Sequence, residues 1–185
     1  MRRTAVLPLI VALGLGLSET RTLAAADAKA TASVQDIEWK HLVPPGYDPS
    51  QLVRKYYDDV AKLKDDDPRA ERLAEALRRA WESAPVVASL DNKTVKLSGF
   101  LVSLEGDGKA VSEFLLVPYF GACIHVPPPP SNQIVLVRTR ARPYKISHSF
   151  ERVSVTGRLR TEQARNDLAS ASYVIEAARV EPHAP

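Results

Sequence analysis

Two periodicities divide the chain, one helical and one alternating. Over residues 50–83, apolar side chains recur three or four positions apart with charged residues between them, the spacing of one helix face. Asp67 and Pro68 interrupt this stretch, and both suit the start of a helix, Asp67 as its cap and Pro68 as its first residue. The pattern therefore predicts a helical hairpin whose charged side chains form a solvated face.

After Pro85, apolar and polar positions alternate, which is typical of β-strands. We expect five short strands, at residues 94–102, 113–119, 133–138, 153–159 and 173–180. The first and fourth share a pattern with a central glycine, Gly99 and Gly157, and a glycine in mid-strand indicates a bulge or a sharp bend. Residues 161–168 are polar and are expected to form a short helix or a loop.

Five short strands, two of them bent, predict a mainly β fold of the α+β class. We expect a small OB-like curled sheet or partly open barrel, preceded by the helical hairpin. The expected organisation is a signal peptide at 1–26, a flexible lead-in at 27–36, an extended segment and helical hairpin at 37–85, and an OB-like β domain at 86–183. A mature chain of roughly 160 residues is long enough for one domain with its own core.

The N-terminal segment has the three parts of a secretory signal peptide. Arg2 and Arg3 are followed by an apolar stretch at residues 5–17 and by small residues up to Ala26. The alternative, a retained membrane anchor, is disfavoured because a bilayer span needs about 20 apolar residues. We expect cleavage near Ala26, a periplasmic location, and no stable membrane insertion afterwards.

Cleavage alters the charge of the chain. The full sequence holds 25 basic and 22 acidic side chains, whereas the part after residue 26 holds 22 and 21, a net charge of +1. Net charge therefore gives no reason to expect a nucleic-acid partner. A short basic cluster with a tyrosine among its residues is suited to phosphate or anionic headgroups, but such a cluster is most often a solvated loop: Arg138, Arg140, Arg142, Tyr144 and Lys145.

The densest motif spans residues 113–133. An apolar strand runs into Pro118, after which Gly121 permits a tight turn. Cys123 and His125 stand two positions apart, so in an extended segment both side chains project from one face. Four consecutive prolines follow and form a stiff polyproline II rod before the next strand.

Three interpretations of the Cys123–His125 pair stay open. Thiolate and imidazole are donors that suit zinc or copper, with further ligands from His41, His148 or Glu113. A catalytic thiol activated by His125 is the least supported interpretation, because no third, orienting group is evident. In the third interpretation, Cys123 is a small buried hydrophobe and His125 hydrogen-bonds a loop carbonyl. As the only cysteine, Cys123 cannot form an internal disulfide.

The proline rod also has two interpretations. It is either a rigid crossover between two strands or, with its neighbouring aromatic side chains, a surface that a partner docks. The expected binding face consists of Tyr119, Phe120, Gly121, Pro127, Pro128, Pro129, Pro130, Asn132 and Gln133.

The run FLLVPYFGACIHVPPPPSNQ at residues 114–133 resembles an uncharacterised family of exported bacterial proteins, domain-of-unknown-function family 3299. The segments IEWxxLVPPG and VKLSGF are also similar to it, and the resemblance covers residues 37–180. It implies an exported, periplasmic domain, offers no catalytic residue to transfer, and suggests metal handling near ABC-type transport systems.

The sequence thus predicts an exported, non-enzymatic accessory or binding protein. Its partner is expected to be another envelope protein, and its role to serve an ABC-type transport system through the face formed by residues 118–133. A periplasmic protein that binds zinc or copper through Cys123 and His125 is the first alternative, and a Cys–His enzyme the second. No phosphate-binding glycine loop, nucleophile elbow or HExxH motif occurs in the sequence.

Overall fold

The computed structural model describes residues 33–64, 67–104, 110–124, 128–139 and 142–183. The expected signal peptide, most of the lead-in, and the side chains of His125, Pro127 and Arg140 lie outside these residues.

The helical segment is a hairpin of two helices, α1 (Pro49–Val60) and α2 (Pro68–Glu82). Both begin with an aspartate cap and a proline: the carboxylate of Asp48 accepts a hydrogen bond from the Ser50 amide, and that of Asp67 accepts one from the Arg69 amide. The predicted hairpin and its cap at Asp67 are confirmed. Neither helix has a buried residue. The two helices pack against each other along one stripe of half-buried side chains.

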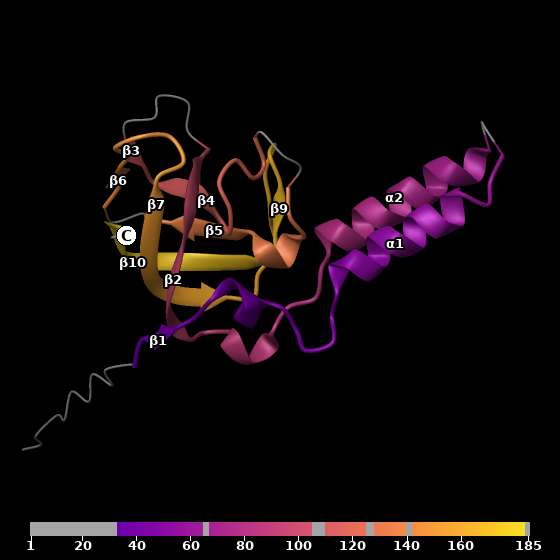
Figure 1. Cartoon of the computed structure of the whole chain (residues 1–185). Helices are drawn as coiled ribbons and strands as arrows, with labels where there is room; N and C mark the ends of the chain where they lie inside the picture. The colour runs from indigo at the N-terminus through magenta and orange to yellow at the C-terminus, as the bar shows by residue number, and fades with distance from the viewer. Residues whose placement is uncertain (1–32, 65–66, 105–109, 125–127, 140–141, 184–185) are drawn as a thin grey trace, which may run out of the picture. The chain divides into compact units, whose positions relative to one another are not determined.

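Five long strands follow the hairpin, as predicted (Figure 1). They are β2 (Thr94–Ser103), β4 (Glu113–Val117), β5 (Val135–Arg138), β7 (Arg152–Arg160) and β10 (Tyr173–Pro182). The short elements are β1 (Gln35–Asp36), η1 (Trp39–Leu42), η2 (Ala88–Leu90), β3 (Ala110–Val111), η3 (Ser131–Gln133), β6 (Tyr144–Lys145), β8 (Ala164–Arg165) and β9 (Ser170–Ala171). Strand β4 stops at Pro118, which lacks an amide donor, and the predicted start of the third strand at Gln133 belongs instead to a 3-10 turn.

The sheet has the order β1-β2-β4-β5-β10-β7, and β7 pairs back with β2, which closes a barrel. If the five long strands β2, β4, β5, β7 and β10 are numbered 1 to 5 in chain order, their order around the barrel is 1-2-3-5-4-1. Strand β10 runs parallel to β5, whereas the other barrel pairs are antiparallel. This arrangement confirms the predicted OB-like barrel.

Gly99 and Gly157 permit close approaches between strands. A Cβ atom at Gly99 would lie 2.7 Å from the carbonyl oxygen of Val117, and one at Gly157 would lie 2.3 Å from that of Glu176. Near Gly99, β2 leaves β7 and joins β4, as the predicted bend requires. The irregularity next to Gly157 lies in β10, between Ala177 and Arg179, rather than in the strand that carries the glycine.

Residues 161–168 do not form the helix that was one of the two predicted forms; the segment is a loop that contains the two-residue strand β8 (Ala164–Arg165). Strands β8 and β9 form a two-stranded sheet of their own. Its turn is held by the side-chain oxygen of Asn166, which accepts hydrogen bonds from the amides of Leu168 and Ala169.

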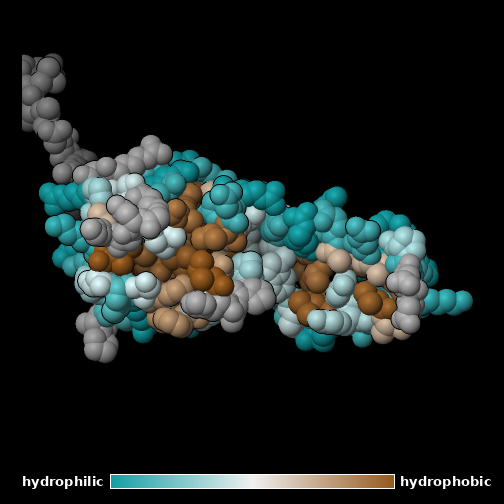
Figure 2. Space-filling view, turned by 90° about the horizontal axis from the view of Figure 1, so that it is seen from above, coloured by the Kyte–Doolittle hydropathy of each residue, from teal (hydrophilic) through white to brown (hydrophobic). Residues whose placement is uncertain are grey.

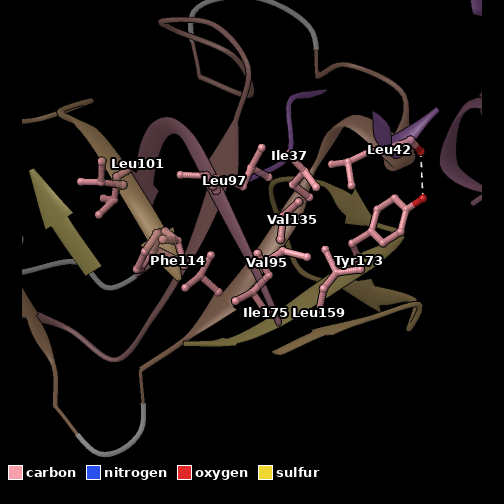
Figure 3. Close-up of a cluster of buried hydrophobic side chains, with 14 of the residues drawn as sticks. Ile37, Leu42, Val95, Leu97, Leu101, Phe114, Val135, Leu159, Tyr173 and Ile175 are labelled. Atoms are coloured by element: carbon pink, nitrogen blue, oxygen red, sulfur yellow. Dashed lines mark hydrogen bonds between the residues drawn. The ribbon is translucent and has the colours of Figure 1, made fainter. Parts of the chain in front are cut away.

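The barrel interior is filled by apolar side chains that alternate along each strand (Figure 3). They include Val95, Leu97, Phe114, Val135, Leu159, Tyr173 and Ile175, with Ile37 and Leu42 entering from the segment before the hairpin. The hydroxyl of Tyr173 donates a hydrogen bond of 2.8 Å to the carbonyl oxygen of Leu42 and accepts one of 2.7 Å from the Val87 amide. Tyr173 therefore ties the segments on both sides of the hairpin to the barrel.

A second apolar cluster covers the outer face of β4 and β5. It consists of Val102, Leu115, Val117, Ala122, Ile134, Leu136, Ala171 and Val174. Both faces of β4 are thus buried, which explains why the run from Phe114 to Val117 is apolar throughout instead of alternating. The loops that follow β4 and β7 supply the cover for this outer face.

Candidate functional site

The connection between β4 and β5, here called the 118–133 loop, has two described parts with different surroundings. Residues 118–124 follow β4, residues 128–133 precede β5, and residues 125–127 lie outside the described residues.

The first part presents apolar side chains to solvent. Tyr119, Phe120 and Ile124 are 41%, 62% and 49% exposed, whereas Ala122 between them is fully buried in the outer cluster. Gly121 and Cys123 on either side of Ala122 have left-handed backbone conformations, with φ of 79° and 68°. These two turns allow Ala122 to point inward while its apolar neighbours stay outside. A left-handed conformation at a residue other than glycine is uncommon. The surrounding fold therefore holds the backbone of Cys123 in a conformation that this residue type disfavours.

Phe120 is supported by two aromatic rings from other parts of the chain. Its ring centroid lies 6.1 Å from that of Phe100 on β2, edge to face, and 5.1 Å from that of Phe150, which precedes β7. Ile124 and Phe150 line an adjoining hollow of about 370 Å³. We call the surface formed by Phe100, Phe120, Ile124 and Phe150 the Phe120 patch. Figure 2 shows hydrophobic side chains gathered on the barrel face seen from above.

The second part of the loop is embedded in the domain. Pro129 and Pro130 are buried, and Asn132 is fully buried. The side-chain amide of Asn132 donates to the carbonyl oxygen of Pro85 at 2.9 Å, and that of Gln133 donates to the carbonyl oxygen of Trp39 at 3.0 Å. These bonds join the loop to the end of the hairpin and to η1.

Two neighbouring residues complete this junction. The hydroxyl oxygen of Ser131 accepts hydrogen bonds from the Ala84 amide at 3.0 Å and from the Ser172 hydroxyl at 2.7 Å. The indole N–H of Trp81 on α2 donates to the carbonyl oxygen of Pro128 at 3.1 Å. Residues 128–133 therefore hold α2, η1 and the segment before β10 together.

The structure thus separates the residues of the expected binding face. Tyr119 and Phe120 reach the surface, and Pro128 is exposed next to α2. The others described lie inside or at the junction: Gly121, Pro129, Pro130, Asn132 and Gln133.

Cys123 is half-buried and packs against the outer cluster. Burial raises the pKa of its thiol to about 11, so the thiol is protonated at neutral pH. The described residues contain no group of three or more His, Cys, Asp or Glu side chains placed to hold a metal ion, and His125 lies outside them. The proposed additional ligands have other contacts: Nδ1 of His41 accepts from the Glu38 amide, and Glu113 accepts from Arg138. Within the described part of the chain, no set of donors is thus gathered around Cys123 that would complete a zinc or copper site.

The basic cluster is divided in the same way. Arg138 is paired with carboxylates of Glu113, Glu162 and Glu176, at 2.8, 3.6 and 3.6 Å. Arg142 and Lys145 line a separate hollow, and Arg140 lies outside the described residues. The guanidinium of Arg138 is thus already neutralised within the sheet.

Sequence reasoning missed two of the three aromatic residues of the patch. Phe100 and Phe150 stand 50 positions apart, and both reach Phe120 because β2 and β7 pair. Phe100 carried a usable signal: it follows Lys96 and Ser98 on the outward phase of its strand, where an apolar ring breaks the alternation. Phe150 lies in a loop and carried none.

The comparisons with known proteins agree with this architecture. A family model described as a protein of unknown function (DUF3299) matches residues 39–182. The crystal structure of a DUF3299 family protein from Pseudomonas aeruginosa PAO1 shares 37% sequence identity with this chain, with a TM-score of 0.60. The match covers 83% of this chain and 98% of that one. Among curated proteins, none matches the chain. Within the described residues, no helix has the length and apolar character needed to cross a membrane.

Proposed function

This chain belongs to the DUF3299 family, and we propose that it is an exported, periplasmic binding protein without enzymatic activity that docks another envelope protein on its Phe120 patch. The family is one of unknown function, so the proposal rests on the residues of this chain.

The observation that carries the proposal is the exposure of Phe120 together with its support. The side chain is 62% exposed, yet the rings of Phe100 and Phe150 fix its position. Covering an aromatic ring that is already ordered gains apolar burial at a small further cost in side-chain entropy. Such anchored aromatic residues are typical of the energetic centres of protein interfaces.

The adjoining hollow indicates the chemistry of the partner. Its volume of about 370 Å³ suits one or two side chains, and no residue that lines it carries a permanent charge. Its lining combines apolar residues, such as Leu101 and Ile124, with polar ones, such as Ser147. Protein interfaces usually combine apolar and polar side chains in this way. The expected occupant is therefore an apolar side chain of a partner protein rather than a charged small molecule.

Two parts of the proposal rest on the sequence. Export rests on the N-terminal segment with Arg2, Arg3 and the small residues before Asp27. The assignment of the partner to an ABC-type transport system rests on the family resemblance, and the identity of the partner tests it.

Site-specific photo-crosslinking in intact cells tests the interface. A photoreactive phenylalanine analogue is placed at Phe120, at Ile124 and, as a control, at Tyr57 on α1, whose side chain is 65% exposed. We expect the same protein to be crosslinked at positions 120 and 124 and not at 57. Absence of any adduct at 120 and 124, or the same adducts at all three positions, contradicts the proposal.

Binding of the purified partner gives the quantitative test. Phe120→Ser is expected to weaken binding about tenfold or more, since truncation of a hot-spot residue costs about 2 kcal/mol or more. Tyr57→Ser, which removes an equally exposed aromatic ring, should leave the affinity unchanged. Equal effects of the two substitutions would show that the patch has no special role.

A further inference from the structure

A cleft of about 740 Å³ lies on the outer face of the barrel, where β2 and β7 meet the end of β10. Strand β1 and η1 contribute to its wall. The residues lining this cleft are distinct from those of the Phe120 patch and its hollow, so the two surfaces can be altered separately.

A short chain of hydrogen bonds crosses the floor of the cleft. Ser98 on β2 and Ser154 on β7 are direct partners in the sheet, and their hydroxyl oxygens lie 2.8 Å apart. The Ser154 hydroxyl also lies 2.9 Å from Nδ1 of His183, at the end of β10. Each hydroxyl can both donate and accept a hydrogen bond, so the choice of donor at His183 determines which atoms donate along the whole chain. When Nδ1 of His183 donates to Ser154, the Ser98 hydroxyl hydrogen becomes available to a ligand.

Two cationic side chains flank this floor from opposite ends. Lys96 precedes Ser98 by two residues on β2, and Arg152 precedes Ser154 by two residues on β7, so all four share the outward phase of their strands. Lys96 and Arg152 are separated by four positions along the ladder, about 13 Å at the usual rise of a strand. Their long side chains can both reach a group that lies over the serine pair.

The acidic residues of the cleft are mostly neutralised. The carboxylate of Glu38 pairs with Lys40 at 2.9 Å, and that of Glu181 pairs with Arg179 at 2.7 Å. The Lys40 ammonium holds the pKa of Glu38 below its usual range. Among the described residues, Asp36, Lys96 and Arg152 are the charged lining groups that form no ion pair, and they leave one positive charge in excess. Asp36 pairs with Lys96 in the sheet, so its negative charge repels an anion bound near Lys96.

From this arrangement we propose that the cleft binds a phosphate-type oxyanion over the Ser98–Ser154 pair, held by Arg152 and Lys96. A guanidinium presents two parallel donors that match phosphate oxygens, an ammonium adds a point charge, and the Ser98 hydroxyl supplies a neutral donor. The phosphate group belongs either to a soluble molecule or to a lipid headgroup.

Titration of the isotope-labelled mature protein with inorganic phosphate tests the proposal by NMR. We expect saturable shifts at the backbone amides of Ser98 and Ser154 and at the His183 ring, with a dissociation constant of about 1 mM. Arg152→Gln and Lys96→Gln should each weaken binding about tenfold, the worth of a charge-assisted hydrogen bond. Asp36→Asn should tighten it by about two- to fivefold, because it removes the one opposing carboxylate.

Arg158→Gln is the matched control, since Arg158 is an exposed arginine on the same phase of β7 but does not line the cleft. Its affinity should equal that of the unaltered protein. Vesicles of phosphatidylglycerol and of phosphatidylcholine separate the sources: retention on anionic vesicles that Arg152→Gln abolishes assigns a lipid headgroup, whereas binding of phosphate alone assigns a soluble ligand. Absence of both kinds of binding, or equal loss in Arg152→Gln and Arg158→Gln, overturns the proposal.

Discussion

The side-chain amide of Asn132 donates a hydrogen bond of 2.9 Å to the carbonyl oxygen of Pro85, 47 positions earlier in the chain. Asn132 is fully buried, and Pro85 follows the last turn of α2, so this bond fixes the exit of the hairpin against the barrel. The polar residues that end the run FLLVPYFGACIHVPPPPSNQ, Ser131 to Gln133, therefore have a structural role: their side chains hold parts of the domain together. Asn132 and Gln133, which the sequence predicts as part of a binding face, and Ser131 before them join four segments of the domain.

Asn132→Ala is expected to destabilise the protein by about 1–3 kcal/mol, because the carbonyl of Pro85 then loses its partner. Urea unfolding followed by circular dichroism measures the change in the free energy of unfolding. Gln51→Ala, at an exposed position of α1, is the control and should change stability by less than about 0.5 kcal/mol. A loss for Asn132→Ala no larger than for Gln51→Ala would show that the junction does not depend on this bond.

Tyr173→Phe should be among the more damaging single-atom changes in the domain. The substitution keeps the ring but removes the hydroxyl that serves the Leu42 carbonyl and the Val87 amide, which leaves two backbone groups without this partner. The expected cost is about 1–3 kcal/mol. Tyr57→Phe, on a side chain that is 65% exposed, provides the comparison and should be neutral. Equal thermal midpoints for the two variants would contradict the role assigned to the Tyr173 hydroxyl.

The fold was readable from the sequence because each barrel strand carries its own local signal. Alternation, or in β4 a short apolar run, located the five long strands, and Gly99 and Gly157 indicated where strands come unusually close. The division of the 118–133 loop into an exposed first part and an embedded second part could not be predicted from the sequence. Whether Phe120 or Asn132 is buried depends on Phe150, Pro85 and other residues that are distant in sequence and are brought together by the closed sheet. A pattern of residue types along one segment cannot encode such partners.

The N-terminal segment predicts processing that mass spectrometry can detect. We expect the protein recovered from the periplasmic fraction to begin at Asp27, since small residues precede this position and the apolar stretch is too short for a bilayer span. Replacement of Ala24 and Ala26 by bulky residues, as Ala24→Phe with Ala26→Phe, should leave the unprocessed form in the membrane fraction. Recovery of the full-length chain from membranes without any substitution would instead support a retained anchor.

Metal content distinguishes the binding-protein proposal from the zinc or copper alternative. Protein purified without a polyhistidine tag is expected to contain no stoichiometric zinc or copper, because the described residues gather no group of three or more His, Cys, Asp or Glu side chains that could hold a metal ion. Cys123→Ala should leave the metal content unchanged. Stoichiometric zinc or copper that disappears in Cys123→Ala or in His125→Ala would establish the metal site in its place.

The reactivity of Cys123 should report its burial directly. With the pKa of its thiol raised to about 11, alkylation by iodoacetamide is expected to be slow at pH 7 and to accelerate about tenfold per pH unit up to that value. The unfolded chain loses this proton near the ordinary thiol pKa, so the folded state binds more protons between pH 9 and 11. Stability from this group is therefore complete below pH 9 and is lost as the pH rises toward 11. Cys123→Ala should lack this part of the alkaline loss, which urea unfolding at pH 8 and pH 10.5 measures. Rapid alkylation near neutral pH would indicate an activated thiol and would favour the Cys–His enzyme.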